Sequence, residues 1–188
     1  MEGKALAVLF PGIGYNCDKP LLYYSAKLAR AAGYDVLPVP YGGFPEKVRG
    51  DADRLRACLD IARTQAEDML AAVDWMAYGD ILFIGKSIGT VVACRYAMER
   101  GLKVRSVLLT PLEETFRYVQ GNAVAFHGTA DPWADTVAVT AACLAQDVPL
   151  HITRGANHSL ETGDVPLDLR TLGKTLWQID TFIREGRA

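Results

Sequence analysis

The sequence predicts an α/β protein built as a three-layer sandwich, in which a six-stranded, mostly parallel sheet carries helices on both faces. Three observations support this prediction. Six short apolar runs are separated by segments long enough to form helices. The first run, residues 5–10, is continuously apolar, which is typical of a strand buried on both faces. The intervening segments repeat apolar residues with the helical period of about 3.6 residues.

Each strand is expected where an apolar run meets residues that break regular structure. The first run ends at Pro11-Gly12, and the third is followed by a glycine-rich turn. Residues 41–45, rich in Gly and Pro, are expected to form a loop. The predicted strands span residues 5–10, 35–39, 81–84, 104–109, 123–127 and 149–153.

The helices are delimited by start and stop signals. Asp18 and Pro20 introduce the first helix and Gly33 ends it, while Gly101 ends the helix that follows the third strand. The longest helical pattern places apolar residues on one face and charged residues elsewhere. The predicted helices span residues 21–32, 51–73, 88–100, 134–146 and 166–184.

Composition restricts the class of protein. The chain has 188 residues, 50% hydrophobic and 22% charged, so we expect one globular domain over residues 1–188. Its 20 basic and 22 acidic residues give a net charge of −2, which points to neither a nucleic-acid nor a membrane partner. No apolar run approaches the roughly 20 residues that span a bilayer, and no secretory signal is recognisable. The 4 cysteines form no CxxC pair, so we expect reduced, mostly buried thiols in a cytoplasmic protein.

The turn after the third strand reads Gly85-Lys86-Ser87-Ile88-Gly89, a GxSxG pattern between an apolar strand and a predicted helix. In that context the pattern predicts a nucleophile elbow, in which the serine is strained and its glycine neighbours let strand and helix close on it. Ser87 would then stand at the start of a helix, where the dipole favours developing negative charge. The alternatives are a glycine-rich turn that only packs and one that binds phosphate.

A serine hydroxyl becomes a good nucleophile only when a base takes its proton and an acid orients that base. Of the three histidines, only His158 lies in a loop that follows every predicted strand. Asp131 follows the fifth strand, so the candidates occur in the order Ser87, Asp131, His158. Asp135 is within reach of the same loop as an alternative acid, and Asp131 could instead cap a helix before Trp133.

The other two histidines are expected to be structural. His127 ends the fifth strand and should shape the turn that presents Asp131. His151 lies within the sixth strand, as a core or face residue. No His, Cys and carboxylate set has metal-ligand spacing and no Walker A pattern occurs, so no metal is expected.

The loop after the first strand should supply part of an oxyanion hole. Acyl transfer needs two N–H donors aimed at the carbonyl oxygen. We expect the backbone N–H of Ile88, directly after the serine, and that of Ile13 in the first loop. The same loop, with Gly12 and Gly14, begins like a dinucleotide fingerprint, but Cys17 replaces the third glycine and the second strand lacks its terminal acid. No cofactor is therefore expected.

Four segments together resemble the α/β-hydrolase superfamily, especially its small members without a lid, which are similar to dienelactone hydrolases, carboxylesterases and acyl-thioesterases. They are residues 9–14, 85–89, 127–131 and 156–158. The resemblance implies a sheet whose strands, numbered along the chain, have the order 2-1-3-4-5-6. It also implies a serine-hydrolase mechanism with Ser87 as nucleophile, His158 as base, Asp131 as acid, and Ile13 and Ile88 as oxyanion donors.

Three residues depart from the family's pattern. Pro11 stands where the first loop usually has a histidine, Lys86 directly precedes the expected nucleophile, and Thr90 follows Gly89 where a second small residue is frequent. Lys86 could bind an anionic substrate or point into solvent, and we expect it to point into solvent. These departures bear on specificity more than on the fold.

The segment in which lids usually enter, residues 110–122, is too short to form one. We therefore expect an open, shallow site suited to small or flexible acyl substrates. Tyr15, Leu112 and Trp133 are the candidate substrate-binding residues. Tyr41 and Phe44 lie in loops at the same edge, and ordinary packing is the alternative role for these loop aromatics.

These observations predict a serine hydrolase that cleaves a small ester or thioester through an acyl-enzyme. A small-molecule acyl substrate is then the expected partner, and the sequence does not indicate an oligomeric state. One alternative is a binding or regulatory module on a hydrolase scaffold, because a fold does not guarantee its chemistry. Another is an acyltransferase or peptidase with the same triad.

Overall fold

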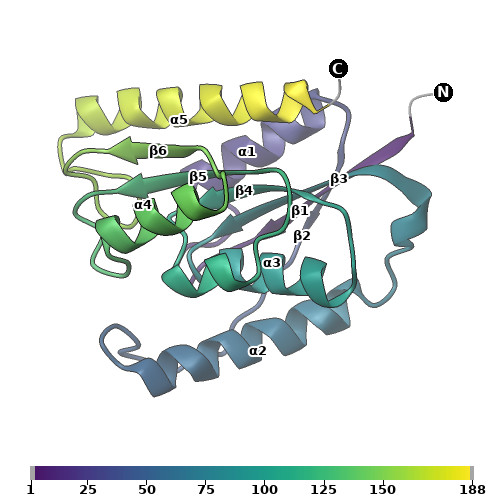
Figure 1. Ribbon diagram of the computed structural model, residues 1–188, viewed down its shortest axis with the longest axis horizontal. Helices are drawn as coiled ribbons and strands as arrows, with labels where there is room; N and C mark the ends of the chain where they lie inside the picture. The colour runs from purple at the N-terminus through teal and green to yellow at the C-terminus, as the bar shows by residue number, and fades with distance from the viewer. Residues whose placement is uncertain (1–2, 187–188) are drawn as a thin grey trace.

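The computed structural model describes residues 3–186, whose six strands form one sheet in the order β2-β1-β3-β4-β5-β6 (Figure 1). All neighbouring strands in it are parallel. The strands are β1 (Lys4–Phe10), β2 (Asp35–Pro38), β3 (Tyr78–Lys86), β4 (Arg105–Leu109), β5 (Ala123–Gly128) and β6 (Leu150–Thr153). The predicted fold class and strand order are confirmed.

Five α-helices in the described part of the chain cover the sheet. They are α1 (Pro20–Ala31), α2 (Ala52–Leu70), α3 (Ile88–Glu99), α4 (Thr136–Ala145) and α5 (Val165–Glu185). α1 and α5 lie on one face of the sheet, and α2, α3 and α4 lie on the other (Figure 1). No helix within residues 3–186 is long and apolar enough to cross a membrane.

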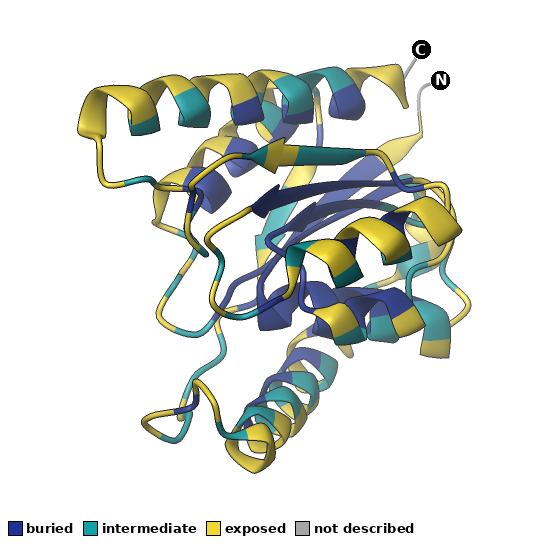
Figure 2. Ribbon diagram, turned by 60° about the vertical axis from the view of Figure 1, so that its left-hand side comes forward, coloured by how far each residue is buried: buried dark blue, intermediate teal, exposed yellow. Residues whose placement is uncertain are grey.

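The middle of the sheet is buried on both faces (Figure 2). Alternate residues of β1 pack into different cores: Leu9 contacts the core under α1 and α5, and Phe10 the core under α2 and α3. Because both faces are covered, such a strand must be apolar at every position, which is why the continuous runs identified it. The edge strands β2 and β6 keep partly exposed residues.

Two boundaries differ from the prediction by three residues, more than any other. β3 begins at Tyr78, ahead of its apolar run, because its backbone already pairs there with Lys4 of β1. α2 ends at Leu70, although the helical spacing continues to Val73. Val73 lies in the turn after the helix and packs against the core that the apolar face of α2 also contacts. Its apolar character therefore reflects burial and not a helical conformation.

The segment between β4 and β5 forms no lid. It holds a short 3₁₀ helix, Glu113–Arg117, in which Thr115 and Phe116 are buried. Phe116 packs in the core that also contains residues of α4. The edge of the sheet above it therefore carries loops only, as the length of the segment predicted.

Arg105, at the start of β4, joins parts of the fold that are distant in the sequence. Its side chain is 12% exposed, and Nη2 lies 3.3 Å from Oδ2 of Asp80 in β3. It also donates to the Tyr34 hydroxyl and to the carbonyls of Phe182 (2.7 Å) and Ile183 (3.2 Å) in α5. The Tyr34 hydroxyl in turn donates to Asp80. One guanidinium thus links β3, β4, the end of α5 and the residue before β2.

We expect Arg105→Met to lower the free energy of unfolding by about 3 kcal/mol, because it removes the cation paired with the largely buried Asp80 carboxylate and the donor to two carbonyls. Arg105→Lys should recover little, since an ammonium lacks the planar fork that reaches several acceptors. Arg95→Met, which breaks a partly exposed pair with Glu99 in α3, is the control and should cost under about 1 kcal/mol. Urea denaturation followed by circular dichroism measures all three, and equal losses for Arg105→Met and Arg95→Met would contradict this role.

Candidate active site

Three loops bring polar side chains together at the carboxyl edge of the sheet, where parallel strands place their following loops. Ser87 follows β3, Asp131 follows β5, and His158 lies between β6 and α5. The Nε2 atom of His158 lies 2.7 Å from Ser87 Oγ, and its Nδ1 atom lies 2.7 Å from Asp131 Oδ2. The structure therefore joins the three predicted residues in one hydrogen-bonded chain.

Ser87 has the strained backbone of a tight turn between strand and helix. Its φ of 57° and ψ of −124° are rare for a residue with a side chain. Its N–H donates to the Leu109 carbonyl at 3.0 Å, and its carbonyl accepts from Thr90 N–H at 2.9 Å and Thr90 Oγ1 at 2.6 Å. The Thr90 hydroxyl also lies 2.6 Å from Thr115 Oγ1. Contacts from β4, α3 and the segment after β4 thus fix the conformation of Ser87.

The second glycine of the GxSxG pattern is required by a close backbone contact. A Cβ atom at Gly89 would lie 2.1 Å from the carbonyl oxygen of Phe10 and 2.5 Å from that of Pro11. No side chain fits in that space, so α3 can start beside the end of β1 only with glycine there. This contact brings the first loop next to the turn that carries Ser87.

Asp131 is the acid that contacts His158. Its side chain is fully buried, and its second oxygen, Oδ1, accepts from the Trp133 N–H at 2.8 Å. Asp131 does not cap a helix, because α4 begins at Thr136, and its contact with Trp133 closes a turn instead. Asp135, the alternative acid, caps α4 by accepting from the Ala138 N–H at 2.9 Å.

The loop that carries His158 is held by contacts that no sequence pattern indicated. Thr110, which follows β4 with a positive φ of 42°, donates from Oγ1 to the His158 carbonyl at 3.1 Å. The Ala130 N–H donates to the Ala156 carbonyl at 2.9 Å. The sequence around Thr110 contains no motif that indicates this role, because the partner of its hydroxyl lies on a different loop. Thr110 is a positioning residue for the histidine.

The environment of His158 favours the neutral ring. Burial lowers its pKa below the usual 6.5, the hydrogen bond to Asp131 opposes this, and the positive charge of Lys86 lowers it further. With Nδ1 donating to Asp131, Nε2 of the neutral ring accepts from the Ser87 hydroxyl. Trp133 stacks on the imidazole with ring centroids 5.5 Å apart and an interplanar angle of 29°. The ring is thus fixed in the tautomer that a general base requires.

The expectation that Lys86 points into solvent was wrong. Its side chain is 1% exposed, and its Nζ atom lies 5.0 Å from the centroid of the Tyr15 ring. Side chains alternate along a strand, so Lys86 faces the same core as Leu82 and Ile84, under α1 and α5. Burial lowers its pKa to about 7, and the nearby negative charge of Asp131 opposes that shift.

The remaining histidines have the structural roles that were predicted. His127 is buried, with Nε2 2.9 Å from Thr136 Oγ1 at the start of α4 and Nδ1 3.9 Å from Asp131 Oδ2. Burial lowers its pKa, so it adds no charge beside Asp131 at neutral pH. His151 is partly buried on β6 and faces α5. Among residues 3–186, no group of three or more His, Cys, Asp or Glu side chains could hold a metal ion.

The two N–H groups predicted as oxyanion donors belong to segments that adjoin Ser87. Ile88 begins α3, where a backbone N–H has no acceptor within the helix. Ile13 lies in a tight turn, whose ends Gly12 and Tyr15 exchange backbone hydrogen bonds of 3.0 and 3.3 Å. A Cβ atom at Gly12 would lie 3.0 Å from Ser87 Cβ, so this turn packs directly against the serine.

The predicted substrate-binding residues lie in different surroundings. Trp133 covers His158, as described above. Tyr15 is partly buried, and burial raises the pKa of its hydroxyl to about 12. Leu112 is 4% exposed and packs into the core under α2 and α3. Trp133 and Tyr15 therefore border the surface at the site, whereas Leu112 supports it from beneath.

A hollow of about 570 Å³ lies beside the first loop. Its walls include Gly12 of that loop and Tyr41 and Phe44 of the loop after β2. The Tyr41 hydroxyl donates to the Pro11 carbonyl at 2.5 Å, which ties the two loops together. Gly12 separates the hollow from Ser87, against which it packs, and Ser87 itself does not line the hollow.

No protein-family model matches the sequence, and no curated protein is significantly similar to it. Several solved structures are similar. A Xanthomonas campestris protein described as an α/β serine hydrolase without lid is 18% identical, with 98% of this chain and 83% of that one covered and a TM-score of 0.63. Alpha/beta hydrolase domain-containing protein 10 from mouse is 13% identical over 98% and 92%, with a TM-score of 0.68. Est1E from Butyrivibrio proteoclasticus, solved with bound ferulic acid, is 15% identical over 95% and 91%, with a TM-score of 0.63.

These similarities extend over nearly the whole of this chain, and their low identity makes them evidence of the fold alone. They agree with the parallel sheet in the order β2-β1-β3-β4-β5-β6 and with the absence of a lid between β4 and β5 in the described residues. Residues 3–186 therefore have the α/β-hydrolase fold, in a form without a lid domain.

Proposed function

We propose that this protein is a serine hydrolase that cleaves small esters or thioesters through an acyl-enzyme. The observation that carries the proposal is the continuous chain from Ser87 Oγ through the His158 ring to Asp131, with both distances at 2.7 Å. A base within hydrogen-bond reach of a hydroxyl, itself oriented by a buried carboxylate, is the arrangement that activates a serine.

In the first half of the reaction, Ser87 Oγ attacks the carbonyl carbon while His158 Nε2 takes the hydroxyl proton. The carbonyl oxygen gains negative charge, which the N–H groups of Ile88 and Ile13 would stabilise together with the start of α3. The intermediate then collapses: the C–O or C–S bond breaks, and the leaving alcohol or thiol takes the proton from His158. Asp131 stabilises the imidazolium that exists between these proton transfers.

In the second half, water attacks the acyl-enzyme. His158 takes the proton of the water and returns it to Ser87 Oγ as the ester bond to the serine breaks. The acid product leaves, and the enzyme regains its starting protonation. No other group is needed to balance the reaction.

The surroundings of the site favour a small acyl substrate. The described residues form no lid to enclose a long chain, and the hollow beside Gly12 is bounded by loop aromatics. Such a shape binds a short acyl or alcohol group by apolar contact. We therefore propose short-chain esters or thioesters as the substrate class.

Ser87→Ala is expected to lower the hydrolysis of p-nitrophenyl acetate by about 10⁴-fold or more, because the nucleophile is lost. A fluorophosphonate probe should label the parent protein once, on Ser87, by intact mass and peptide mapping. His158→Ala should abolish that labelling. Ser159→Ala, a serine in the loop of the histidine, is the control and should keep the parent activity. A folded parent protein without an adduct would instead favour a non-catalytic binding module.

Asp131→Asn should lower kcat by about 10³- to 10⁴-fold, because an amide can donate to Nδ1 and hold the wrong tautomer of His158. Asp135→Asn is the matched control. Asparagine caps a helix about as well as aspartate, so this variant should keep both activity and stability. Comparable losses of kcat in the two variants, measured on the same ester, would reject Asp131 as the acid.

The pH dependence of kcat/KM should report the surroundings of His158. Since the base must be neutral, activity falls as pH drops through its pKa, and the lowered pKa places this acid limb below pH 6.5. Lys86 is charged in that range because its own pKa is about 7. Lys86→Met removes the positive charge, so the pKa of His158 should rise and the limb should move to higher pH. Lys103→Met, at an exposed lysine before β4, should leave the limb in place, and a limb that stays in place or moves lower in Lys86→Met would contradict this coupling.

A further inference from the structure

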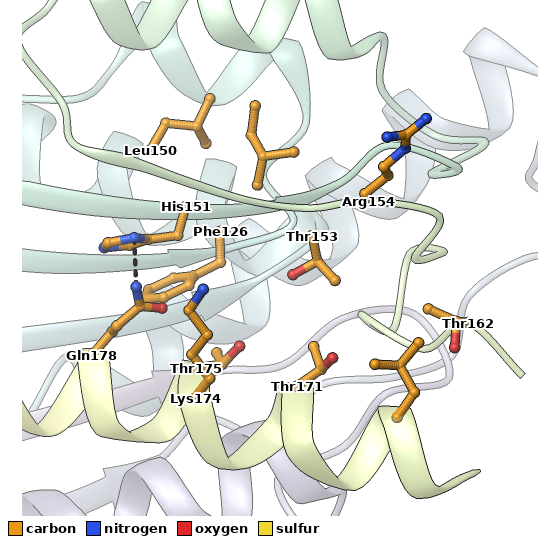
Figure 3. Close-up of a pocket in the computed structure, with 12 residues that line it drawn as sticks. Phe126, Leu150, His151, Thr153, Arg154, Thr162, Thr171, Lys174, Thr175 and Gln178 are labelled. Carbon is orange, nitrogen blue, oxygen red and sulfur yellow. Dashed lines mark hydrogen bonds between the residues drawn. The ribbon is translucent and has the colours of Figure 1, made fainter. Parts of the chain in front are cut away.

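A second cavity, of about 440 Å³, lies between β6 and α5 (Figure 3). Its walls include Thr153 and Arg154 at the end of β6, Lys174 and Thr175 on α5, and Thr162 in the loop between them. None of the residues that line it belongs to the hydrogen-bonded chain of Ser87, His158 and Asp131. The proposed hydrolase mechanism makes no use of this cavity.

The charge lining the cavity has one sign. Lys174 and Arg154 are the charged residues of its wall, and no carboxylate lines it. In Figure 3 the Lys174 side chain extends from α5 toward β6, while the Arg154 side chain lies at the far end of β6. Neither cation forms an ion pair with a carboxylate in the part of the chain that the structure describes. The cavity is therefore electrostatically suited to an anion.

Hydroxyl groups without partners add donors to this charge. The side-chain hydroxyls of Thr153, Thr171 and Thr175 line the cavity, and none of them forms a hydrogen bond within residues 3–186. Thr175 is 3% exposed, and in Figure 3 its hydroxyl lies in the space between α5 and β6. Its oxygen is not one of the fully buried atoms that lack a partner, so water reaches it through the cavity, and the charged oxygen of an anion would replace that water.

One wall of the cavity is formed by the imidazole ring of His151. Gln178 on α5 donates from Nε2 to Nδ1 of His151 at 2.8 Å, which leaves the proton of the neutral ring on Nε2. The imidazole stacks on Phe126 with ring centroids 5.0 Å apart and an interplanar angle of 27°. Burial and the positive charge of Lys174 both lower the pKa of His151. The ring thus stays uncharged at neutral pH and forms an aromatic wall beside the cations.

We propose that the cavity between β6 and α5 binds a small molecule through a phosphate-like anionic group held by Lys174 and by the hydroxyls of Thr153, Thr171 and Thr175. A lysine ammonium binds phosphate as a point charge, and hydrogen bonds to charged oxygens are stronger than neutral ones. The volume is that of a small-molecule site. The group could be inorganic phosphate or the phosphate of a small monoester. This proposal does not depend on the hydrolase activity.

The test is a ¹⁵N NMR titration with inorganic phosphate and, separately, with glycerol 3-phosphate, each at ionic strength held constant with sodium chloride. We expect saturable shifts confined to the amides of residues 150–154 and 171–178. Lys174→Gln and Thr175→Val should each raise Kd by about ten-fold or more, since each removes a hydrogen bond to a charged oxygen. Lys103→Gln, at an exposed lysine far along the chain, should keep the parent Kd.

The outcomes separate the sources of the anion. Saturation by both probes supports a site for the phosphate group itself, and saturation by glycerol 3-phosphate alone supports a site for a monoester. Shifts that do not saturate, or a Kd that is the same in the parent and in Lys174→Gln, would overturn the proposal. Lys174 is exposed, so its substitution should leave the fold intact. The Kd of Lys174→Gln therefore tests the proposal even if Thr175→Val is unstable.

Discussion

The close packing of α3 against the end of β1 is the constraint on which the site depends. A side chain at Gly89 would meet two backbone carbonyl oxygens, so only glycine lets the helix begin there. This contact sets the Ile88 N–H, the Ser87 hydroxyl and the Ile13 turn close to one another. It also holds Ser87 in a conformation that costs free energy, which the hydrogen bonds of its backbone to the Leu109 carbonyl and from Thr90 offset.

Beneath the site, buried charges are arranged so that the histidine stays neutral. Asp131 is fully buried and accepts hydrogen bonds from His158 and from the Trp133 backbone. Lys86, buried on the other side of β3 from α3, supplies a positive charge that lowers the pKa of the same histidine. The carboxylate orients the ring while the ammonium disfavours its protonation. The two charges therefore have opposite effects on the protonation of His158: Asp131 raises its pKa and Lys86 lowers it.

The segment between β6 and α5 connects the two candidate sites. It begins at Arg154 and reaches Thr162, which both border the second cavity, and it carries His158 in between. The Thr110 hydroxyl and the Ala130 N–H hold its middle against the loops after β4 and β5. The ends of this segment border the cavity beside α5, and its centre places His158 next to Ser87. One short stretch of chain therefore contributes to both candidate sites.

The sequence by itself determined the architecture and pointed to Ser87, His158 and Asp131, with Asp135 left as an alternative to Asp131. The helical period, the continuous apolar runs and the glycines that end helices are properties of short stretches of sequence. They were therefore enough to locate nearly every strand and helix. Ser87 lies within a short pattern, and His158 was singled out by its place after the last strand. The largest boundary errors occurred where burial or strand pairing acted outside the local pattern, at Val73 and Tyr78.

The tertiary structure decided what depends on distance between remote residues. Asp135 lies in the same loop as Asp131, and only the path of that loop in the folded chain brings Asp131 within 2.7 Å of His158. In the sequence, Lys86 resembles a surface lysine. In the structure it is buried, because the alternation of side chains along β3 turns it toward the face that α1 and α5 cover. Thr110, the Arg105 cluster and the cavity at Lys174 have no local signal, because each combines groups from separate elements. The local sequence pattern predicts which face of a helix or strand is buried. Which residues that face contacts depends on the folded chain.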